Sequence, residues 1–149
     1  MLTLDLLACS MAFLHVHPRA HELFSVTSGR VVTEMVPEAG IVDADGKPRV
    51  IRSDLGPNMA TLFPQGSFHL AINPECNNAT IAVVFTSEDP GTGLVPSQTF
   101  TFSDDVISNQ FGGSIAGEDI DKVRDAIPQG MQVMIDGCLA SCGKQKREA

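Results

Sequence analysis

Residues 15–29 read HVHPRAHELFSVTSG, and this stretch decides how the rest of the chain is interpreted. It contains three of the four histidines, followed at once by a glutamate. Alternate side chains of a β-strand point to the same face, so His15 and His17 would project together and could share one metal ion. Pro18 ends such a strand, and a hairpin would bring Glu22 back beside the two imidazole rings. The stretch therefore predicts part of a metal site.

A fourth candidate ligand lies in residues 63–73, FPQGSFHLAIN, where His69 follows a Pro-Gln-Gly turn on an apolar strand. Three neutral imidazoles and one carboxylate suit an ion such as manganese or iron, with open positions left for water or substrate. A single histidine is more often a surface residue or a hydrogen-bonded core residue than a ligand. The set at these spacings favours a metal site formed by His15, His17, Glu22 and His69.

Length and charge exclude some classes of function. A chain of 149 residues is about one domain. The net charge of -8 argues against a nucleic-acid partner, which normally needs a basic surface. The basic cluster Lys144, Lys146 and Arg147 is interpreted as a solvated tail. No apolar run is long enough to cross a membrane, and residues 1–14 lack the basic start of a signal peptide, so we interpret them as a buried strand.

Short β-strands dominate the first part of the chain. An extended apolar segment covers residues 11–17, and two β-branched segments, 22–28 and 30–36, flank Gly29 and are interpreted as a hairpin. DADGK at residues 43–47 predicts a turn. Strands are also expected at residues 50–55, 59–63, 68–73 and 78–87. Strands at this spacing are typical of an antiparallel sandwich or barrel.

Helical patterns follow the strands. Ser103 is expected as an N-cap, with acidic residues in the first turn after it. The next helix would end before Pro128, and a third short helix would end at Gly143. The second of these helices places four apolar residues on one face: Ile120, Val123, Ala126 and Ile127. We therefore expect one domain, with a β-barrel at residues 1–100, helices at 101–143 and a tail at 144–149.

Two spaced patterns carry a family resemblance. The pattern H-x-H-x4-E-x6-G is matched by His15, His17, Glu22 and Gly29, and P-x-G-x2-H-x3-N is matched by Pro64, Gly66, His69 and Asn73. Together they resemble the two motifs of cupins, in particular germins and the spherulin-like fungal proteins. The similarity continues through SEDPGT, DIDKVRDAIP and CLASCG. The resemblance implies an all-β cupin jelly-roll barrel with a short C-terminal α-helical appendage. It also implies a manganese ion on the four candidate ligands and a homo-oligomer held by the C-terminal helices.

The chain departs from the family pattern at three places. Several strands normally precede the first motif, but fourteen residues precede His15 here, so we expect either a barrel that is incomplete at one edge or a shortened gene model. Asn58 stands where germins usually have a glycine before the second motif. Oxalate-oxidising members keep an asparagine three residues before the first histidine, and this chain has Ala12 there. The last departure argues against oxalate oxidation.

Two side chains of the first motif are candidates for catalysis. His21 replaces the threonine that is usual in the family, and a neutral imidazole could accept or donate a proton near neutral pH. Arg19 lies between the ligands in the sequence and could strengthen the attraction of an anionic substrate. The alternative for His21 is a turn histidine in solvent, and the alternative for Arg19 is a solvated or structural arginine.

Three functions remain open. One carboxylate on a divalent ion leaves a net charge of about +1, which favours a manganese-dependent oxidoreductase acting on a small anion such as superoxide or a small carboxylate. Alternatively, the metal acts as a Lewis acid in a cyclisation or isomerisation of a small apolar metabolite. The third reading is a non-catalytic binding or storage protein whose ion braces the barrel. The fold alone does not choose between them.

The four cysteines and a glycosylation sequon at Asn78 indicate an extracellular protein. In a jelly roll of this family, the strand that bears His15 should pair antiparallel with the strand that bears His69. Cys9 and Cys76 would then lie nearly opposite each other, so a Cys9–Cys76 disulfide is predicted. A Cys138–Cys142 bond is the second expectation.

Overall fold

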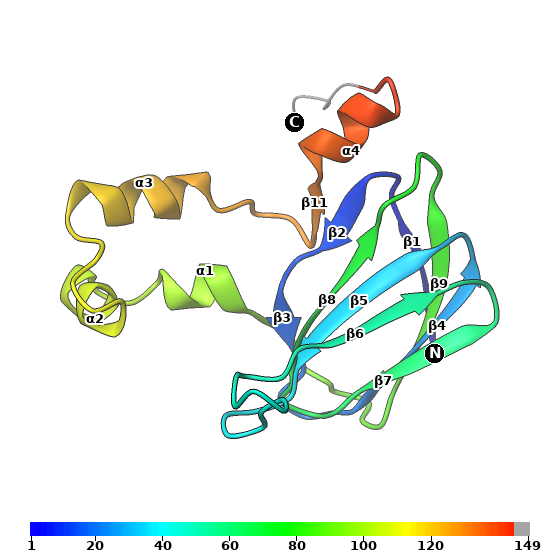
Figure 1. The fold of residues 1–149 in the computed structure, drawn as a ribbon, viewed down its shortest axis with the longest axis horizontal. Helices are drawn as coiled ribbons and strands as arrows, with labels where there is room; N and C mark the ends of the chain where they lie inside the picture. Colours follow the sequence, from blue (N-terminus) through cyan, green and yellow to red (C-terminus); the bar gives the residue numbers. More distant parts are fainter. Residues whose placement is uncertain (145–149) are drawn as a thin grey trace.

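Two antiparallel β-sheets face each other and enclose an apolar core in the computed structural model, which describes residues 1–144 (Figure 1). The first sheet has the strand order β1-β9-β4-β7. Its strands are β1 (Leu2–Leu6), β9 (Ala79–Phe85), β4 (Glu22–Ser28) and β7 (Met59–Phe63). The second sheet centres on β8, which pairs with β2, β3 and β5.

The second sheet is extended by short strands on both sides of that centre. β10 pairs with β3, β11 pairs with β2, and β6 pairs with β5. The bounds are β2 (Ser10–Ala12), β3 (His15–Val16), β5 (Val31–Val36), β6 (Ile51–Leu55), β8 (Phe68–Asn73), β10 (Gly93–Leu94) and β11 (Gln132–Met134). The expected all-β jelly roll with a helical appendage is confirmed.

Alternation of apolar and exposed residues along the strands forms the core between the sheets. In β4, for example, Phe24 and Val26 are buried, whereas Leu23 is exposed on the outer face. The core cluster consists of Leu6, Phe24, Val26, Val31, Met35, Leu55, Phe63, Ala71, Ala79, Ile81 and Val83.

The expected hairpin around Gly29 is wrong. β4 pairs with β7 and β9, whereas β5 pairs with β6 and β8, so the segment at Gly29 carries the chain from one sheet to the other. Gly29 has a φ of 82°, and a Cβ at this position would lie 2.8 Å from the Cβ of Ala79. The glycine is therefore needed for a tight crossing and not for a two-stranded turn.

The turn at residues 43–47 is confirmed by the hydrogen bond from the Asp43 amide to the Lys47 carbonyl, 2.9 Å.

The N-terminal segment is not one buried strand as expected. It divides into β1 and β2, which belong to different sheets. β1 is the edge strand of the first sheet, and its inward-facing Leu2 and Leu4 are 49% and 43% exposed. Only Leu6 of this row is fully covered by the core.

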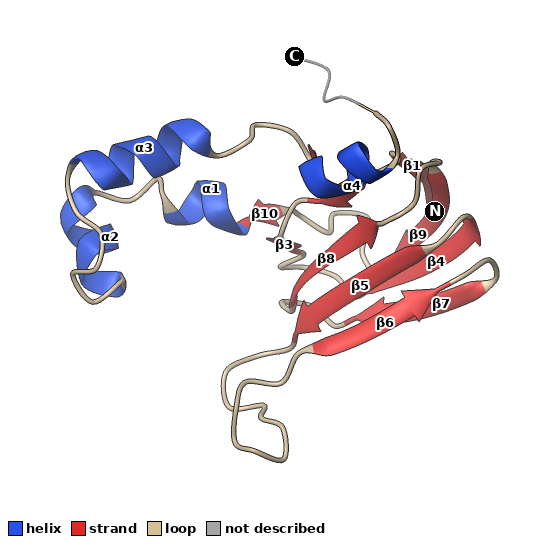
Figure 2. Ribbon diagram, turned by 45° about the horizontal axis from the view of Figure 1, so that its top comes forward, coloured by secondary structure: helices blue, strands red, loops and turns tan. Residues whose placement is uncertain are grey.

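Helices follow the last long strand, and α1 to α3 extend to one side of the sheets (Figure 2). Ser103 precedes α2 as expected, but its side chain makes no capping hydrogen bond. Ile120 is fully buried, Val123 and Ile127 are half-buried, and Ala126 is exposed, so the expected apolar face is only partly covered. The helices are α1 (Val95–Thr99), α2 (Asp104–Gln110), α3 (Glu118–Ala126) and α4 (Asp136–Ser141).

The segment expected as a third helix begins as a strand. β11 pairs with β2, and the helix α4 starts only at Asp136.

Lys144 of the expected basic tail is exposed, and Lys146 and Arg147 lie outside the described residues. Across residues 1–144, none of the helices has the length and apolar character needed to span a membrane.

The disulfide pairing differs from the expectation. The bonds are Cys9–Cys138 and Cys76–Cys142, with Cα–Cα separations of 5.3 and 5.5 Å. The strand pairing behind the expectation is correct, because Ser10 lies opposite Asn73 and the Cys9 amide donates to the Glu75 carbonyl. Cys138 on α4 and Cys142 at its C-terminal end are one helical turn apart, so each reaches one of the two cysteines in the loops next to β2 and β8. Both bonds therefore hold α4 to the barrel.

Candidate metal centre

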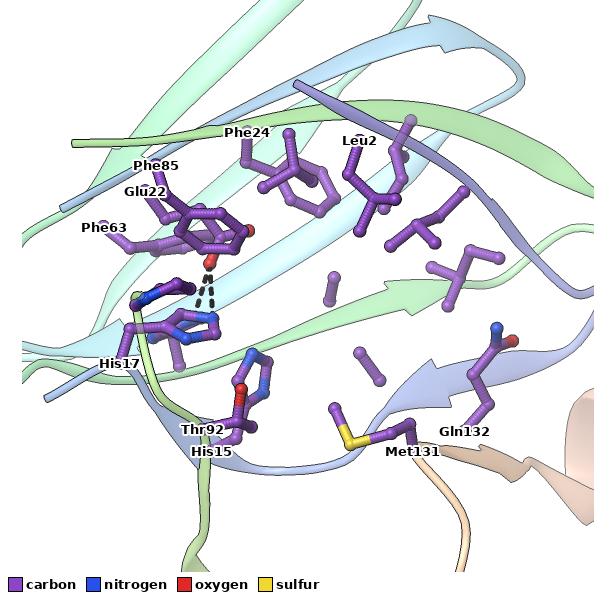
Figure 3. A pocket seen from close by; sticks show the side chains of 18 of the residues that line it. Leu2, His15, His17, Glu22, Phe24, Phe63, Phe85, Thr92, Met131 and Gln132 are labelled. Carbon is purple, nitrogen blue, oxygen red and sulfur yellow. Dashed lines mark hydrogen bonds and ion pairs between the residues drawn. The ribbon is translucent and has the colours of Figure 1, made fainter. Parts of the chain in front are cut away.

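The two sheets bring the four sequence-predicted metal ligands together. His15 in β3 lies directly opposite His69 in β8, and Glu22 opens β4 in the facing sheet. His17 follows β3 and points into the same space (Figure 3). The four residues are buried, with exposed fractions between 2 and 8%. One ligand atom of each lies within 4.8 Å of the others. The cluster could therefore hold a single metal ion.

Each of the three histidines is oriented by a backbone carbonyl. The Nδ1 of His15 donates to the Phe13 carbonyl at 2.6 Å, and the Nδ1 of His17 donates to the Gly91 carbonyl at 2.5 Å. The Nδ1 of His69 donates to the Ser67 carbonyl at 2.9 Å. A carbonyl can only accept, so these contacts place the ring proton on Nδ1 and leave the lone pair on Nε2. Partners of this kind are typical of metal-binding histidines.

The arrangement around Glu22 requires a positive charge. Its Oε2 lies 3.0 Å from the Nε2 of His17 and 3.2 Å from the Nε2 of His69. With the neutral tautomers set by the carbonyls, both Nε2 atoms and the carboxylate oxygen are acceptors, and acceptors at this distance repel each other. Protons on both rings, or one metal ion among the three groups, remove the repulsion. The donor set of nitrogen and carboxylate oxygen fits a divalent transition metal.

The local electrostatics favour this donor set. Burial and the neighbouring His69 lower the pKa of His15 to about 4, so this ring is neutral at physiological pH. Burial would raise the pKa of Glu22, but the hydrogen bonds with His17 and His69 outweigh it and lower that pKa to about 2. Burial opposes the charged form of His17 as well, yet its contacts with Glu22 and Gly91 raise its pKa. An ionised carboxylate and a neutral His15 are the forms that bind metals.

A cavity of about 460 Å³ starts at the four ligands and extends along the inside of the barrel (Figure 3). Thr92 lies near His15 at the metal end, Met131 and Gln132 follow at increasing distance from His15, and Leu2 lies across the cavity beside Phe24. Apolar side chains form most of the wall between the two ends: Leu4, Leu6, Ala12, Phe24, Ala71, Ile81 and Val83.

Aromatic rings pack directly on two of the ligands, and the sequence motifs did not indicate them. The Phe63 ring stacks on His69 with centroids 4.2 Å apart and planes at 12°. The Phe85 ring meets the edge of His17 at 4.7 Å. Both phenylalanines lie opposite Glu22 in the strand register. The alternation of β7 and β9 could have identified them as inward-facing, but it could not have placed them beside the histidines.

The two candidate catalytic residues lie outside this cavity. His21 is exposed, and its Nδ1 accepts a hydrogen bond from the Gln65 amide at 3.0 Å. Arg19 is exposed and forms an ion pair with Asp89 at 2.7 Å. Neither residue is part of the cavity wall. A catalytic role for either one stays a prediction.

Comparison with known proteins agrees with the fold and the motifs. The model of the family described as Cupin matches residues 1–119. Spherulin-1A of Physarum polycephalum is 34% identical over 139 residues, covering 91% of this chain and 52% of that protein. Germin-like protein subfamily 1 member 1 of Arabidopsis thaliana is 30% identical over 118 residues, covering 76% of this chain and 50% of that protein. The chain thus spans about half the length of these curated relatives.

Solved structures show the same fold at lower identity. A structure of oxalate oxidase superposes with a TM-score of 0.71 at 19% identity, covering 83% of this chain and 60% of that one. A Bacillus subtilis oxalate decarboxylase structure has a TM-score of 0.70 at 13% identity, with coverages of 89% and 32%. The family match extends over most of the residues that carry the two sheets and all four candidate ligands. The chain belongs to the cupin family.

Proposed function

We propose that this chain is a manganese-binding, germin-like cupin that works as a metal-dependent oxidoreductase on a small anion, either superoxide or a carboxylate. One observation carries the proposal: three histidine Nε2 atoms and one carboxylate converge at the buried end of a cavity, with every Nδ1 proton held by a carbonyl. The residues His15, His17, Glu22 and His69 would hold the ion. When bound, manganese supplies a redox-active centre whose positive charge attracts an anionic group.

The chain's own residues would prepare the site for this chemistry. The carbonyls of Phe13, Gly91 and Ser67 keep the three rings in one tautomer. The rings of Phe63 and Phe85 exclude water from one side of the cluster. The similarity to germin-like proteins and the shared fold with oxalate oxidase and oxalate decarboxylase support an enzyme of this type. Iron is the alternative metal for the same ligands.

Elemental analysis of the purified protein tests the proposal first. We expect about one manganese or iron per chain, with the metal lost in a His69→Ala variant. The loaded protein is then assayed for dismutation of superoxide and for release of carbon dioxide from oxalate with dioxygen as the oxidant. Zinc in every preparation, or no metal at all, would contradict the redox function.

A second candidate function is favoured by the apolar wall of the cavity. The metal would act as a Lewis acid on an apolar metabolite, in a cyclisation or isomerisation without net oxidation. Phe24, Ile81 and Val83 would surround the body of such a molecule. Turnover that continues without dioxygen and with a redox-inert divalent ion would select this function over the first.

We also propose that the protein is extracellular and forms homo-oligomers through its C-terminal helices. The two disulfides support an oxidising compartment. Phe102, Val106 and Phe111 are exposed apolar residues around α2, and they support an interface between subunits. Sedimentation of the wild type and of a Val106→Asp variant tests the interface, since the charged variant should be the smaller species.

A further inference from the structure

We infer that the ligand of this site is an amphiphile in which one metal-binding oxygen group is joined to an apolar body, and that a compact dicarboxylate does not fit. The inference rests on the proposed metal site and names its class of substrate. The metal end of the cavity would take the oxygen group. The rest of the cavity is lined mostly by apolar side chains, which suit a hydrocarbon body.

The wall of the cavity lacks a partner for a second anionic group. Among the described residues that line it, none is a lysine or an arginine. Apart from Glu22, its one charged residue is Asp5, which carries no positive charge for an anion to pair with and whose carboxylate accepts from the Thr80 hydroxyl. An anion placed in this space without a partner would lose the hydration that it has in water. A dicarboxylate is therefore disfavoured here.

The remaining polar side chains near the far end already have partners. The Oε1 of Gln132 accepts from the Leu7 amide at 3.0 Å and from the Ser10 hydroxyl at 3.2 Å, and its Nε2 donates to the Asp5 carbonyl at 2.9 Å. The Asp5 carboxylate accepts from the Thr80 hydroxyl at 2.9 Å. These contacts hold β11 and β9 against β1. Because these polar groups are already paired, a ligand would contact mainly apolar side chains in this part of the cavity.

The inward face of the edge strand β1 offers an apolar surface to the body of the ligand. Leu2 and Leu4 face the inside of the barrel opposite Val83 and Ile81, yet both are about half exposed. Figure 3 shows Leu2 beside Phe24, across the cavity from His15, and the register carries the row from there through Leu4 to Leu6, away from the metal end. A ligand with its oxygen group at the metal end and a hydrocarbon body along β1 would cover these leucines. Burial of that apolar surface favours binding.

A matched pair of variants on β1 isolates this surface. Leu4 faces the cavity, whereas Thr3 faces the outside of the sheet opposite Ala82. Leu4→Arg places a cation on the apolar wall without touching the metal ligands. Thr3→Arg adds the same charge to the same strand on the other face. Both positions are exposed enough for the longer side chain to reach water.

Calorimetric titration with butanoate, hexanoate, octanoate and decanoate, and with oxalate and succinate, tests the inference. On the manganese-loaded protein we expect affinity to rise about threefold to fourfold for each methylene added until the cavity is full. Leu4→Arg should weaken octanoate binding at least tenfold, and Thr3→Arg should leave it unchanged. Equal affinity along the series, tighter binding of oxalate or succinate than of octanoate, or equal effects of the two arginine variants would overturn the inference.

The same titration of metal-free protein separates this inference from the proposed function. Without metal, every alkyl carboxylate should bind more weakly, but the increment per methylene should remain because the apolar wall is intact. If the protein fails to bind manganese while the increment is present, the metal-dependent function is wrong and the apolar site stands. If manganese binds and the increment is absent, the metal site stands and the inference about the ligand is wrong.

Discussion

His15 stands directly opposite His69 in the pairing of β3 with β8, with the two ring centroids 4.3 Å apart. This cross-strand pair brings His15 of the first sequence motif into contact with His69 of the second. Residues opposite each other on antiparallel strands have their side chains on the same face of the sheet. The register of β8, which also pairs with β2 and β5, therefore fixes where the fourth ligand meets the first.

Replacement of His69 by alanine should abolish tight metal binding. The loss of a group that only orients a ligand costs about 10–100-fold in metal affinity, and the loss of a ligand itself should cost more. Metal content after dialysis, measured by elemental analysis, gives the result. His21→Ala is the matched control, since His21 is the one histidine outside the cluster, and it should keep its metal. A His69→Ala protein with a full metal complement would disprove the ligand set.

Replacement of Phe63 should destabilise the fold strongly, whereas replacement of its neighbour Leu62 should have little effect. Phe63 is buried in the core and stacks on His69, whereas Leu62 is exposed on the outer face of the same strand. Phe63→Ala should lower the free energy of unfolding of the metal-free protein by about 3–5 kcal/mol. Leu62→Ala should change it by no more than about 0.5 kcal/mol. Urea denaturation followed by circular dichroism measures both, and similar costs would mean that the inward face of β7 is assigned wrongly.

The convergence of the four candidate ligands could be predicted from the sequence because it depends largely on short spacings within two motifs. His15 and His17 are two residues apart, and the strand at residues 68–73 has the bounds that its apolar pattern predicted. The paired motifs then placed His69 beside the other ligands. The apolar cavity and the rings of Phe63 and Phe85 could not be predicted in this way, because they depend on the register between strands far apart in the sequence.

The errors have a common physical origin. The segment around Gly29 has the composition of a hairpin, but a glycine with positive φ serves equally in a crossing between sheets, and only the pairing of β4 with β9 distinguishes the two. The Cys9 amide does bond the carbonyl of Glu75, the residue before Cys76, so the two cysteine-bearing segments meet. Their choice of partner depends on α4, whose position against the strands is a tertiary contact that local patterns do not encode.

Replacement of Arg124 should loosen the helices and leave the metal site intact. Its guanidinium donates to the carbonyls of Phe100 and Phe102 and forms ion pairs with Asp104 and Asp121. Arg124→Met should increase hydrogen exchange in α1 to α3, while the strands keep their protection. The metal content should not change, because no residue of α1 to α3 belongs to the cluster. Loss of metal in this variant would show that the helices support the site.

Two double variants should reveal the disulfide pairing. Cys9→Ser with Cys138→Ser removes one bond and leaves Cys76–Cys142, so the protein should have no free thiol. Cys9→Ser with Cys76→Ser breaks both bonds and should leave two free thiols on α4. The first variant should lose about 2–4 kcal/mol of stability and the second about twice as much. Thiol titration under denaturing conditions and peptide mapping without reductant measure the outcome. A Cys9 peptide joined to Cys76 or Cys142 would contradict the pairing, as would a Cys9→Ser, Cys76→Ser protein without free thiols.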